Sequence, residues 1–427
     1  MRKSFSFLLA IGVCALMQIT VAAQSADLDS VVSPETVKTT EIASPNDAPT
    51  LSGTDLRIRM TEAKQLLKSR ADLSGGKTVT LAALDPVTSE LHLLTIDKDL
   101  FLTKDASLLI TSQRGLEVRL TVVRANGVNT AVTVKALSTG RELTPLMVAY
   151  PIVRNGSITE IAYYASAHPA LLSSDTSSAG ESYVTTTLDT AARNLSDKGV
   201  NIPSDIVDIA EHLCVVEHTD HKRFITEKHS QLFPEILSLY ALNQGNTYRY
   251  SVSTAGAGGM IQMIPRTYEG IRQQHPAVPL QADFVSGMRD HANALQAMLL
   301  YMNDTWNKLE ESSEVQDALR SGTATKPELL AAGYNSNPLR LPQYLRNGGA
   351  DWRTLIPAET QMYLAIYSEV DRNIKFNAPA NAGLLRDNSS SADFGTAIAD
   401  ARGTGRFMSW LTQQFVSGGS AMIDLFR

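Results

Sequence analysis

The sequence Ser253-Thr-Ala-Gly-Ala-Gly-Gly-Met-Ile-Gln-Met-Ile-Pro265 decides how the rest of the chain is interpreted. It joins small residues and a Gly258-Gly259 pair to an apolar run that contains one amide, Gln262. Glycine has no Cβ, so its backbone can approach another body closely. An unpaired buried amide costs about 1–3 kcal/mol, so Gln262 needs polar neighbours. On its own the stretch fits either a tightly packed junction between a loop and a helix or a binding site.

A helix expected over residues 203–217 supplies a second feature. Ile206, Ala210, Leu213 and Glu217 follow a spacing of four, three and four, which places them on one helix face. A carboxylate therefore ends the apolar face. Burial disfavours the charged form and raises the pKa of a carboxyl group, as a general acid at neutral pH requires. The alternative is a glutamate that caps a neighbour or pairs with a cation.

A third feature lies in residues 330–338, where a helix end is expected to run into a polar turn. Tyr334 and Asn335 stand side by side in this turn. A tyrosine offers a flat face and a hydroxyl, and an asparagine offers a donor and an acceptor, which together suit sugar recognition. The alternative is an ordinary proline-terminated helix with an asparagine cap.

In this order, the three segments resemble the lytic transglycosylase family, which has a lysozyme-like fold. The family's catalytic glutamate corresponds to Glu217. Its Gly-Leu-Met-Gln-like motif corresponds to residues 259–262, and its Ala-Tyr-Asn-like motif to residues 332–335. Residues 357–363 look like the family's closing helix. The resemblance covers about residues 200–373.

The resemblance implies cleavage of the bond between N-acetylmuramic acid and N-acetylglucosamine in peptidoglycan. Glu217 would protonate the leaving glycosidic oxygen and then act as base on the muramic acid 6-hydroxyl, which closes a 1,6-anhydro ring. This chemistry needs no cofactor, no metal and no second carboxylate, unlike the usual glycosidase pair. The expected substrate-binding residues are Ser253, Gly259, Met260, Gln262, Tyr334 and Asn335.

The chain departs from the family pattern in two places. His218 follows Glu217, where the family usually has serine. The connection between Glu217 and the glycine-rich stretch is also long, and an inserted helical segment at about residues 224–250 would explain it. The insertion leaves Glu227 and Glu235 as rival acids. We prefer Glu217 because its helix is long, has an apolar face and ends there.

Three other functions compete with this interpretation. The sequence Cys214-Val-Val-Glu-His218 is one residue from the His-x-x-Glu-His pattern of some zinc proteases, and His212, His221 and His229 lie nearby. The zinc hypothesis lacks a candidate for the downstream glutamate ligand and does not explain the glycine-rich stretch, so we expect no metal. A non-catalytic peptidoglycan-binding or scaffold protein, and a lysozyme-type hydrolase that uses water, both remain open.

Composition and the first residues indicate an exported globular protein. The chain is 43% hydrophobic and 19% charged. Residues 1–23 are typical of a secretory signal, with Arg2 and Lys3 before an apolar run. Its removal would take the net charge from −6 to −8, which does not favour nucleic-acid binding. It would also leave Cys214 without a partner for a disulfide. We expect a periplasmic or otherwise exported bacterial protein.

The amino-terminal third is expected to hold a disordered leader, a helix and a β domain. Residues 24–50 are rich in Ser, Thr, Ala and Pro, which predicts disorder. A helix is expected within residues 51–76, with Leu56, Met60, Ala63 and Leu67 on its buried face. Alternating apolar residues within 77–172 predict a small antiparallel β domain. Asn-Gly pairs at 126–127 and 155–156 predict two hairpin turns.

The remainder is predicted to be helical, so the fold class is α+β and multidomain, with a lysozyme-like domain over residues 181–373. Residues 374–427 are expected to form a loose segment and an amphipathic tail helix. The expected partners are peptidoglycan glycan strands, with the β domain or tail helix as the contact for cell-envelope proteins. The expected helices are 181–198, 203–217, 230–242, 263–274, 286–310, 326–334 and 358–373.

Overall fold

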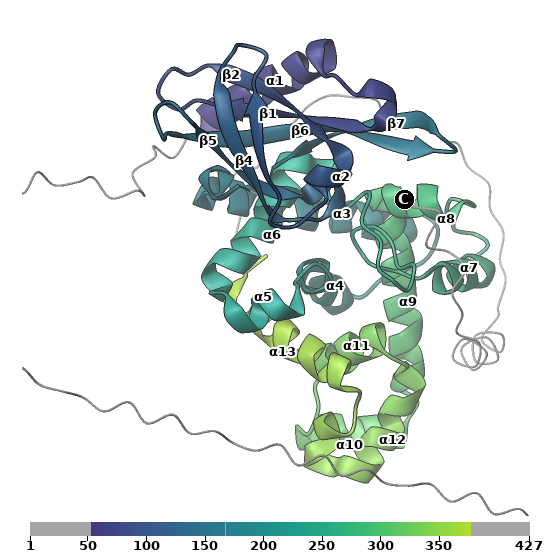
Figure 1. Cartoon of the computed structure of the whole chain (residues 1–427). Helices are drawn as coiled ribbons and strands as arrows, with labels where there is room; N and C mark the ends of the chain where they lie inside the picture. Colours follow the sequence, from purple (N-terminus) through teal and green to yellow (C-terminus); the bar gives the residue numbers. More distant parts are fainter. Residues whose placement is uncertain (1–52, 167, 377–427) are drawn as a thin grey trace, which may run out of the picture. The chain divides into compact units, whose positions relative to one another are not determined.

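The computed structural model describes residues 53–166 and 168–376 (Figure 1). These residues combine a mainly antiparallel sheet with a larger set of helices, so a mixed α and β fold is confirmed for this part of the chain. The expected signal (1–23), the expected leader (24–50) and the expected tail beyond residue 376 lie outside the described residues. Within the described ranges, no helix combines the length and the apolar character that crossing a membrane requires.

The first helix forms where its apolar spacing predicts. Helix α1 spans Gly53–Arg70, and Leu56, Met60, Ala63 and Leu67 are all buried. They pack with Leu84, Leu146 and other sheet residues in a small cluster of their own. The helix is thereby fixed on the sheet through contacts with strands β1 and β6.

The seven strands form one continuous antiparallel arrangement. The order is β2-β1-β6-β5-β4-β3, and β7 also pairs with β6. In β4, Val118, Leu120 and Val122 are buried while their neighbours are more exposed, as alternation predicts. The strands are β1 (Thr78–Leu84), β2 (Leu91–Asp97), β3 (Ser107–Thr111), β4 (Glu117–Arg124), β5 (Ala131–Ala136), β6 (Glu142–Arg154) and β7 (Ser157–Ala165).

Both predicted hairpins are confirmed, with different turns. Strands β6 and β7 join through Asn155 and Gly156, whose φ angles of 50° and 76° suit a two-residue hairpin turn. Strands β4 and β5 also pair, but a 3₁₀ turn at Gly127–Asn129 follows Asn126. A register shift in β4 after Val122 accompanies this longer connection.

Helix α3 corrects the expected start of the helical part. It spans Ser174–Ser196 and therefore begins before residue 181, where the helical part was expected to start. Ser173 and Thr176 form a capping box, which satisfies free N–H groups of the first turn. Gly180 lies against helix α6 (His229–Asn243) so closely that a Cβ would be 1.9 Å from the Leu237 carbonyl oxygen. This glycine therefore marks a close contact between two helices.

The other helices follow the predicted pattern with one division and four additions. Asp290 caps a new helix by accepting from the Asn293 N–H, so the helix expected over 286–310 becomes α8 and α9. Helices α2, α5, α10 and α12 have no counterpart among the expected helices. The bounds are α2 (Lys98–Phe101), α4 (Ser204–Val216), α5 (His221–Thr226), α6 (His229–Asn243), α7 (Pro265–Gln274), α8 (Phe284–Arg289), α9 (His291–Leu309), α10 (Ser313–Ser321), α11 (Lys326–Asn335), α12 (Leu341–Gly348) and α13 (Ala358–Asn373). Further 3₁₀ turns lie at Ser74–Gly76, Pro169–Leu171, Gln244–Asn246, Pro338–Arg340 and Gly349–Thr354.

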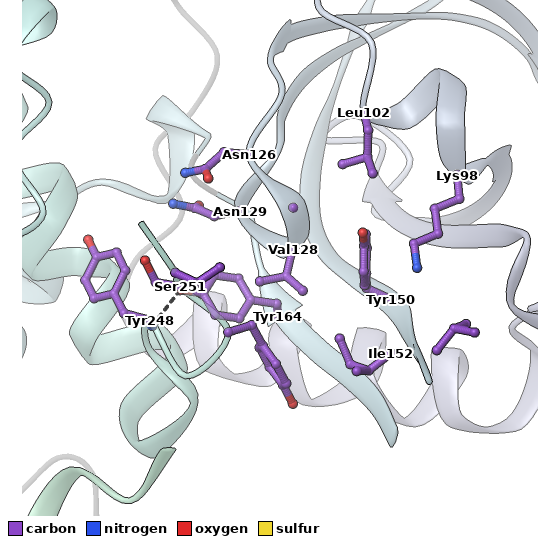
Figure 2. Close-up of a pocket in the computed structure, with 14 residues that line it drawn as sticks. Lys98, Leu102, Asn126, Val128, Asn129, Tyr150, Ile152, Tyr164, Tyr248 and Ser251 are labelled. Carbon is purple, nitrogen blue, oxygen red and sulfur yellow. Dashed lines mark hydrogen bonds between the residues drawn. The ribbon is translucent and has the colours of Figure 1, made fainter. Parts of the chain in front are cut away.

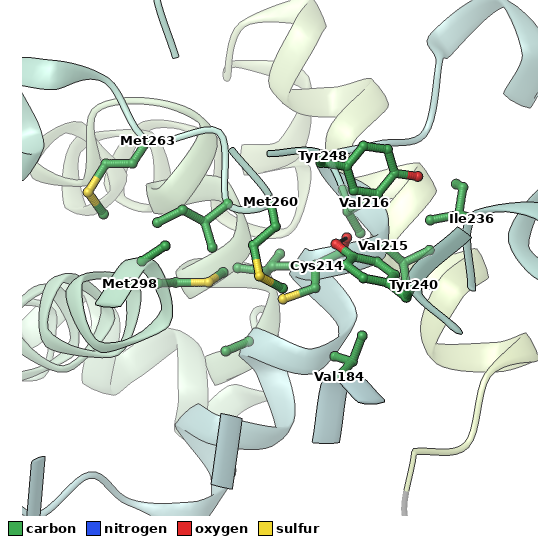
Figure 3. Close-up of a cluster of buried hydrophobic side chains, with 14 of the residues drawn as sticks. Val184, Cys214, Val215, Val216, Ile236, Tyr240, Tyr248, Met260, Met263 and Met298 are labelled. Atoms are coloured by element: carbon green, nitrogen blue, oxygen red, sulfur yellow. Dashed lines mark hydrogen bonds between the residues drawn. The ribbon is translucent and has the colours of Figure 1, made fainter. Parts of the chain in front are cut away.

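The sheet and the helices share one hydrophobic core. A single cluster of buried side chains runs from Val79 and Leu120 in the sheet to Leu213, Met260 and Met298 in the helical part. Part of it surrounds helix α4 (Figure 3). This helix contacts α3, α6, α9, α11 and α13, so its carboxyl end is held from several sides.

Candidate functional site

The three segments singled out in the sequence meet at the carboxyl end of helix α4. His218 Nε2 donates to the Met260 carbonyl at 2.9 Å. The Tyr334 hydroxyl donates to the next carbonyl, that of Ile261, at 2.7 Å. A side chain just after α4 and one from α11 thus hold two consecutive peptide groups of the glycine-rich loop. The loop is fixed in place beside Glu217.

Glu217 ends helix α4 and is bound by a tyrosine from α13. The Tyr363 hydroxyl donates to Glu217 Oε1 at 2.6 Å. Burial raises the pKa of Glu217 to about 8, against the lowering effect of the Tyr363 bond and with a further increase from the Glu359 charge. The residue is half-buried and keeps some accessible surface. Its carboxyl group is therefore protonated at neutral pH and is not sealed from solvent.

His218 is a neutral, fixed side chain. Its ring stacks on Tyr248, with ring centroids 3.4 Å apart and planes 3° from parallel. Burial lowers the pKa of His218 to about 3, although the bond to the Met260 carbonyl raises it. Because Nε2 carries the proton given to that carbonyl, Nδ1 carries a lone pair. His218 therefore fixes the glycine-rich loop to the end of α4 through one hydrogen bond and one ring contact.

The two rival acids are ion-paired. Glu235 accepts from Arg223 at 2.7 Å and from Arg124 at 3.0 Å. Burial alone would raise the pKa of Glu235, but the Arg223 hydrogen bond and both arginine charges hold it below its usual value. Glu227 is exposed and pairs with Arg223 as well. Glu235 has a lowered pKa and Glu227 lies exposed in an ion pair, so Glu217 is the best general acid of the three.

Two of the predicted binding residues serve internal contacts. Gly259 has a φ of 72°, and a Cβ there would be 2.4 Å from the Met288 carbonyl oxygen. Its missing side chain therefore lets the loop approach the end of α8. Met260 is fully buried near Cys214 and Met298 (Figure 3). In this conformation its side chain belongs to the core, and only its carbonyl takes part in the site.

Ser253 and Gln262 shape the loop. Ser253 Oγ accepts from the Ala257 N–H at 3.0 Å, which closes the turn before the glycines. Gln262 has a φ of 45°, uncommon for a residue with a side chain. Its Nε2 donates to the Gly259 carbonyl at 2.7 Å and to Ser251 Oγ at 3.3 Å. The amide thus finds the polar partners that its apolar surroundings demand, and its half-buried side chain keeps an oxygen acceptor.

In the third motif, Tyr334 and Asn335 bind different partners. The Tyr334 hydroxyl is used by the loop carbonyl, as described above. Asn335 Oδ1 accepts from the Thr360 hydroxyl of α13 at 2.8 Å, which leaves the amide NH₂ as a donor group. Both Tyr334 and Asn335 are half-buried. Tyr334 also lies close enough to Glu217 for the carboxylate charge to raise the pKa of the phenol, after burial.

Sequence reasoning did not include the residues that complete the site. Tyr363 and Thr360 lie three residues apart on α13, hence on one helix face, and they bind Glu217 and Asn335. The tyrosine stands out in the expected closing helix, but no spacing rule links it to a glutamate 146 positions away. Tyr248 lies in the expected insertion, where a stacking partner for His218 could not be recognised.

The residues of the zinc hypothesis are dispersed. Cys214 is buried in the core, and burial raises the pKa of its thiol. His212 binds the Asp208 carbonyl, and His229 binds the Phe224 carbonyl. Across residues 53–166 and 168–376, no three His, Cys, Asp or Glu side chains gather closely enough to hold a metal ion.

Comparisons with protein families, with curated proteins and with solved structures find no match for this chain. What the site can do is therefore inferred from its own side chains. It offers one protonated carboxyl group at a helix end, a tyrosine hydroxyl bound to it, and a braced loop with two amide side chains nearby. This set suits proton transfer to an oxygen atom of a bound polar substrate.

Proposed function

We propose that this protein is a peptidoglycan lytic transglycosylase with a lysozyme-like helical domain, exported to the bacterial periplasm. The observation that carries the proposal is Glu217, a half-buried acid with a raised pKa, bound by Tyr363 where the three motif segments meet. The order of those segments along the chain matches the family. Glycan strands are the proposed substrate, and contact with cell-envelope proteins is proposed for the sheet.

The reaction uses Glu217 twice. Its proton passes to the oxygen that links N-acetylmuramic acid to N-acetylglucosamine, and the bond from that oxygen to the muramic acid C1 breaks. The resulting carboxylate takes the proton of the muramic acid 6-hydroxyl, whose oxygen bonds to C1 and closes the 1,6-anhydro ring. The Tyr363 hydroxyl stabilises the carboxylate between these steps, because a hydrogen bond to a charged acceptor is stronger than one to a neutral acceptor.

A lysozyme-type hydrolase is the second candidate, because one observation favours it. Glu359 lies close enough for its charge to raise the pKa of Glu217. A second carboxylate beside an acid is the usual arrangement for hydrolysis by water. Glu359→Gln separates the two functions: it would abolish hydrolysis but leave the anhydro-forming reaction largely intact.

The test is digestion of purified murein followed by mass spectrometry of the products. Anhydro-muropeptides support a transglycosylase, and reducing ends indicate a hydrolase. A folded protein that binds murein without forming either product would be a binding or scaffold protein. Glu217→Gln should abolish cleavage and retain murein binding, whereas Glu227→Gln, a matched change at an exposed ion pair, should cleave normally. Undiminished cleavage by Glu217→Gln would remove this residue from the mechanism.

A further inference from the structure

A pocket of about 320 Å³ lies between the sheet and the segment that precedes the glycine-rich loop (Figure 2). Its volume falls in the range of about 300–1,000 Å³ found for sites that bind small molecules. Its walls combine tyrosine and aliphatic side chains with a smaller number of polar groups. The lining includes Tyr150, Tyr164, Tyr248, Tyr250, Lys98 and Asn129.

Two polar side chains of the pocket suit a ligand with both a carboxylate and amide groups. Lys98 is half-buried. Its Nζ donates to the Pro151 carbonyl at 2.8 Å and lies 4.4 Å from the centroid of the Tyr150 ring. An ammonium group has three donors, so this bond leaves two for an anion. Asn129 is 8% exposed, and among the described residues its Oδ1 has no hydrogen-bond partner. A buried acceptor of this kind is stabilised by a donor N–H.

The surroundings of the pocket favour a negative ligand. The Tyr250 ring has the guanidinium groups of Arg249 and Arg289 within 5.9 and 5.1 Å of its centroid. Both arginines pair with a single acid, Glu160, which also accepts from the Tyr250 hydroxyl. The two arginines exceed the single carboxylate that pairs with them, and Asp283, close enough for the Arg289 charge to lower its pKa, offsets part of this excess.

The pocket shares two wall residues with the site at Glu217. Tyr248 lines the pocket, and its ring stacks on His218, which follows Glu217 directly. Ser251 also lines it and accepts from Gln262 of the glycine-rich loop. These two contacts place the pocket next to the glycine-rich loop.

We propose that this pocket is a subsite for the stem peptide that branches from the muramic acid of the substrate. Lys98 pairs with a peptide carboxylate, Asn129 accepts a peptide N–H, and the tyrosines cover aliphatic parts of the peptide. A glycan without peptides carries only the lactyl carboxylate on each muramic acid ring, whereas a peptide joins a carboxylate, N–H groups and aliphatic parts in one flexible chain. This combination matches Lys98, Asn129 and the tyrosines, which is why the peptide is preferred to a further sugar. The inference rests on the proposed function, since it assigns a second recognition element to the same substrate.

The first test compares two substrates. Glycan strands with stem peptides are compared with the same strands stripped by an amidase and then amidated at the lactyl carboxylates that stripping exposes. Both are digested by the parent protein, Lys98→Met and Lys98→Arg. Lys98→Met should lose about 10-fold in kcat/KM on peptide-bearing strands, the lower end of what a hydrogen bond to a charged group provides. It should change less than about 2-fold on stripped strands, and Lys98→Arg should retain most activity on both. Equal losses on both substrates, or none, would overturn the proposal.

The second test needs no cleavage. A synthetic stem tetrapeptide with free carboxylates, and its fully amidated counterpart, are titrated by NMR into full-length Glu217→Gln protein. Saturable binding of the free form, weakened by Lys98→Met and by amidation, supports the subsite even if murein is never cut. Absence of binding overturns it even if murein is cut normally. Thermal unfolding of Lys98→Met, with a Tm near that of the parent, excludes loss of fold as the cause.

Discussion

The hydrogen bond from Tyr363 to Glu217 can be tested by removing one oxygen atom. Tyr363→Phe keeps the ring of a buried side chain and deletes the hydroxyl that lies 2.6 Å from Glu217 Oε1. In the native protein this bond lowers the pKa of Glu217 and opposes the effect of burial. Without it, burial acts unopposed, so the pKa must rise.

The size of the shift follows from the strength of such bonds. A hydrogen bond to a charged group contributes about 1.5–3 kcal/mol, and one pKa unit corresponds to about 1.36 kcal/mol. The pKa of Glu217, about 8 in the native protein, should therefore rise by roughly one to two units. Because the acid must be protonated to act, activity should persist to higher pH by the same amount. The rate near pH 7 should fall about 10-fold or more, since the carboxylate formed in the first step is less stable.

Two measurements check this expectation. The side-chain ¹³C signal of Glu217, assigned by its absence in Glu217→Gln, gives the pKa independently of any activity. The pH dependence of kcat/KM on murein then gives the position of the basic limb. Tyr344→Phe, a change at another half-buried tyrosine on α12, is the matched control and should alter neither. An unchanged or lowered pKa in Tyr363→Phe would refute the direct bond and the role given to α13.

Three further predictions concern stability. Gly259→Ala should destabilise the protein by about 2–4 kcal/mol, because residue 259 has a positive φ and the new Cβ would collide with the Met288 carbonyl. Urea unfolding measures this change, and a loss below about 0.5 kcal/mol would contradict the contact. Glu235→Gln should lower the free energy of unfolding by about 2 kcal/mol, since it leaves Arg124 and Arg223 without their shared carboxylate. Murein cleavage per folded molecule should stay normal. Burial raises the pKa of Glu211 from 4.5 to about 7, so native stability should fall as pH rises between these values. Glu211→Gln should remove about 3 kcal/mol of that fall. Parallel stability curves for the parent and Glu211→Gln from pH 4 to 8 would show that the raised pKa is wrong.

Local patterns predicted the parts of the fold that local physics decides. The spacing of Leu56 to Leu67 identified α1, and the Asn155-Gly156 pair identified a hairpin, since both depend on neighbours within a few residues. The same kind of spacing located Glu217 at the end of α4. The helix start at Ser174 was missed because polar residues suggested a loop, although Ser173 and Thr176 carry the chemistry of a cap.

Contacts between distant segments could not be predicted in this way. The glycine at 259 was expected to face a ligand, yet its close neighbour is Met288 of the same chain. Met260 was placed in a cleft, but an apolar side chain in an apolar run is equally suited to a core. The arginines that pair with Glu235 come from a strand and from another helix, so its ionised state was not evident from its own helix.

The continuous core beneath the sheet and the helices has a practical consequence. Asn243 of α6 accepts from the Ala165 N–H of β7, and the Tyr164 hydroxyl accepts from the Tyr248 N–H. A truncated fragment starting at α3 would expose the side of α6 that contacts β7 and leave Asn243 Oδ1 and the Tyr248 N–H without their partners. Such a fragment should aggregate during expression, and the intact chain should melt in one cooperative transition. Any attempt to transfer this acid to another protein must therefore carry the sheet with it.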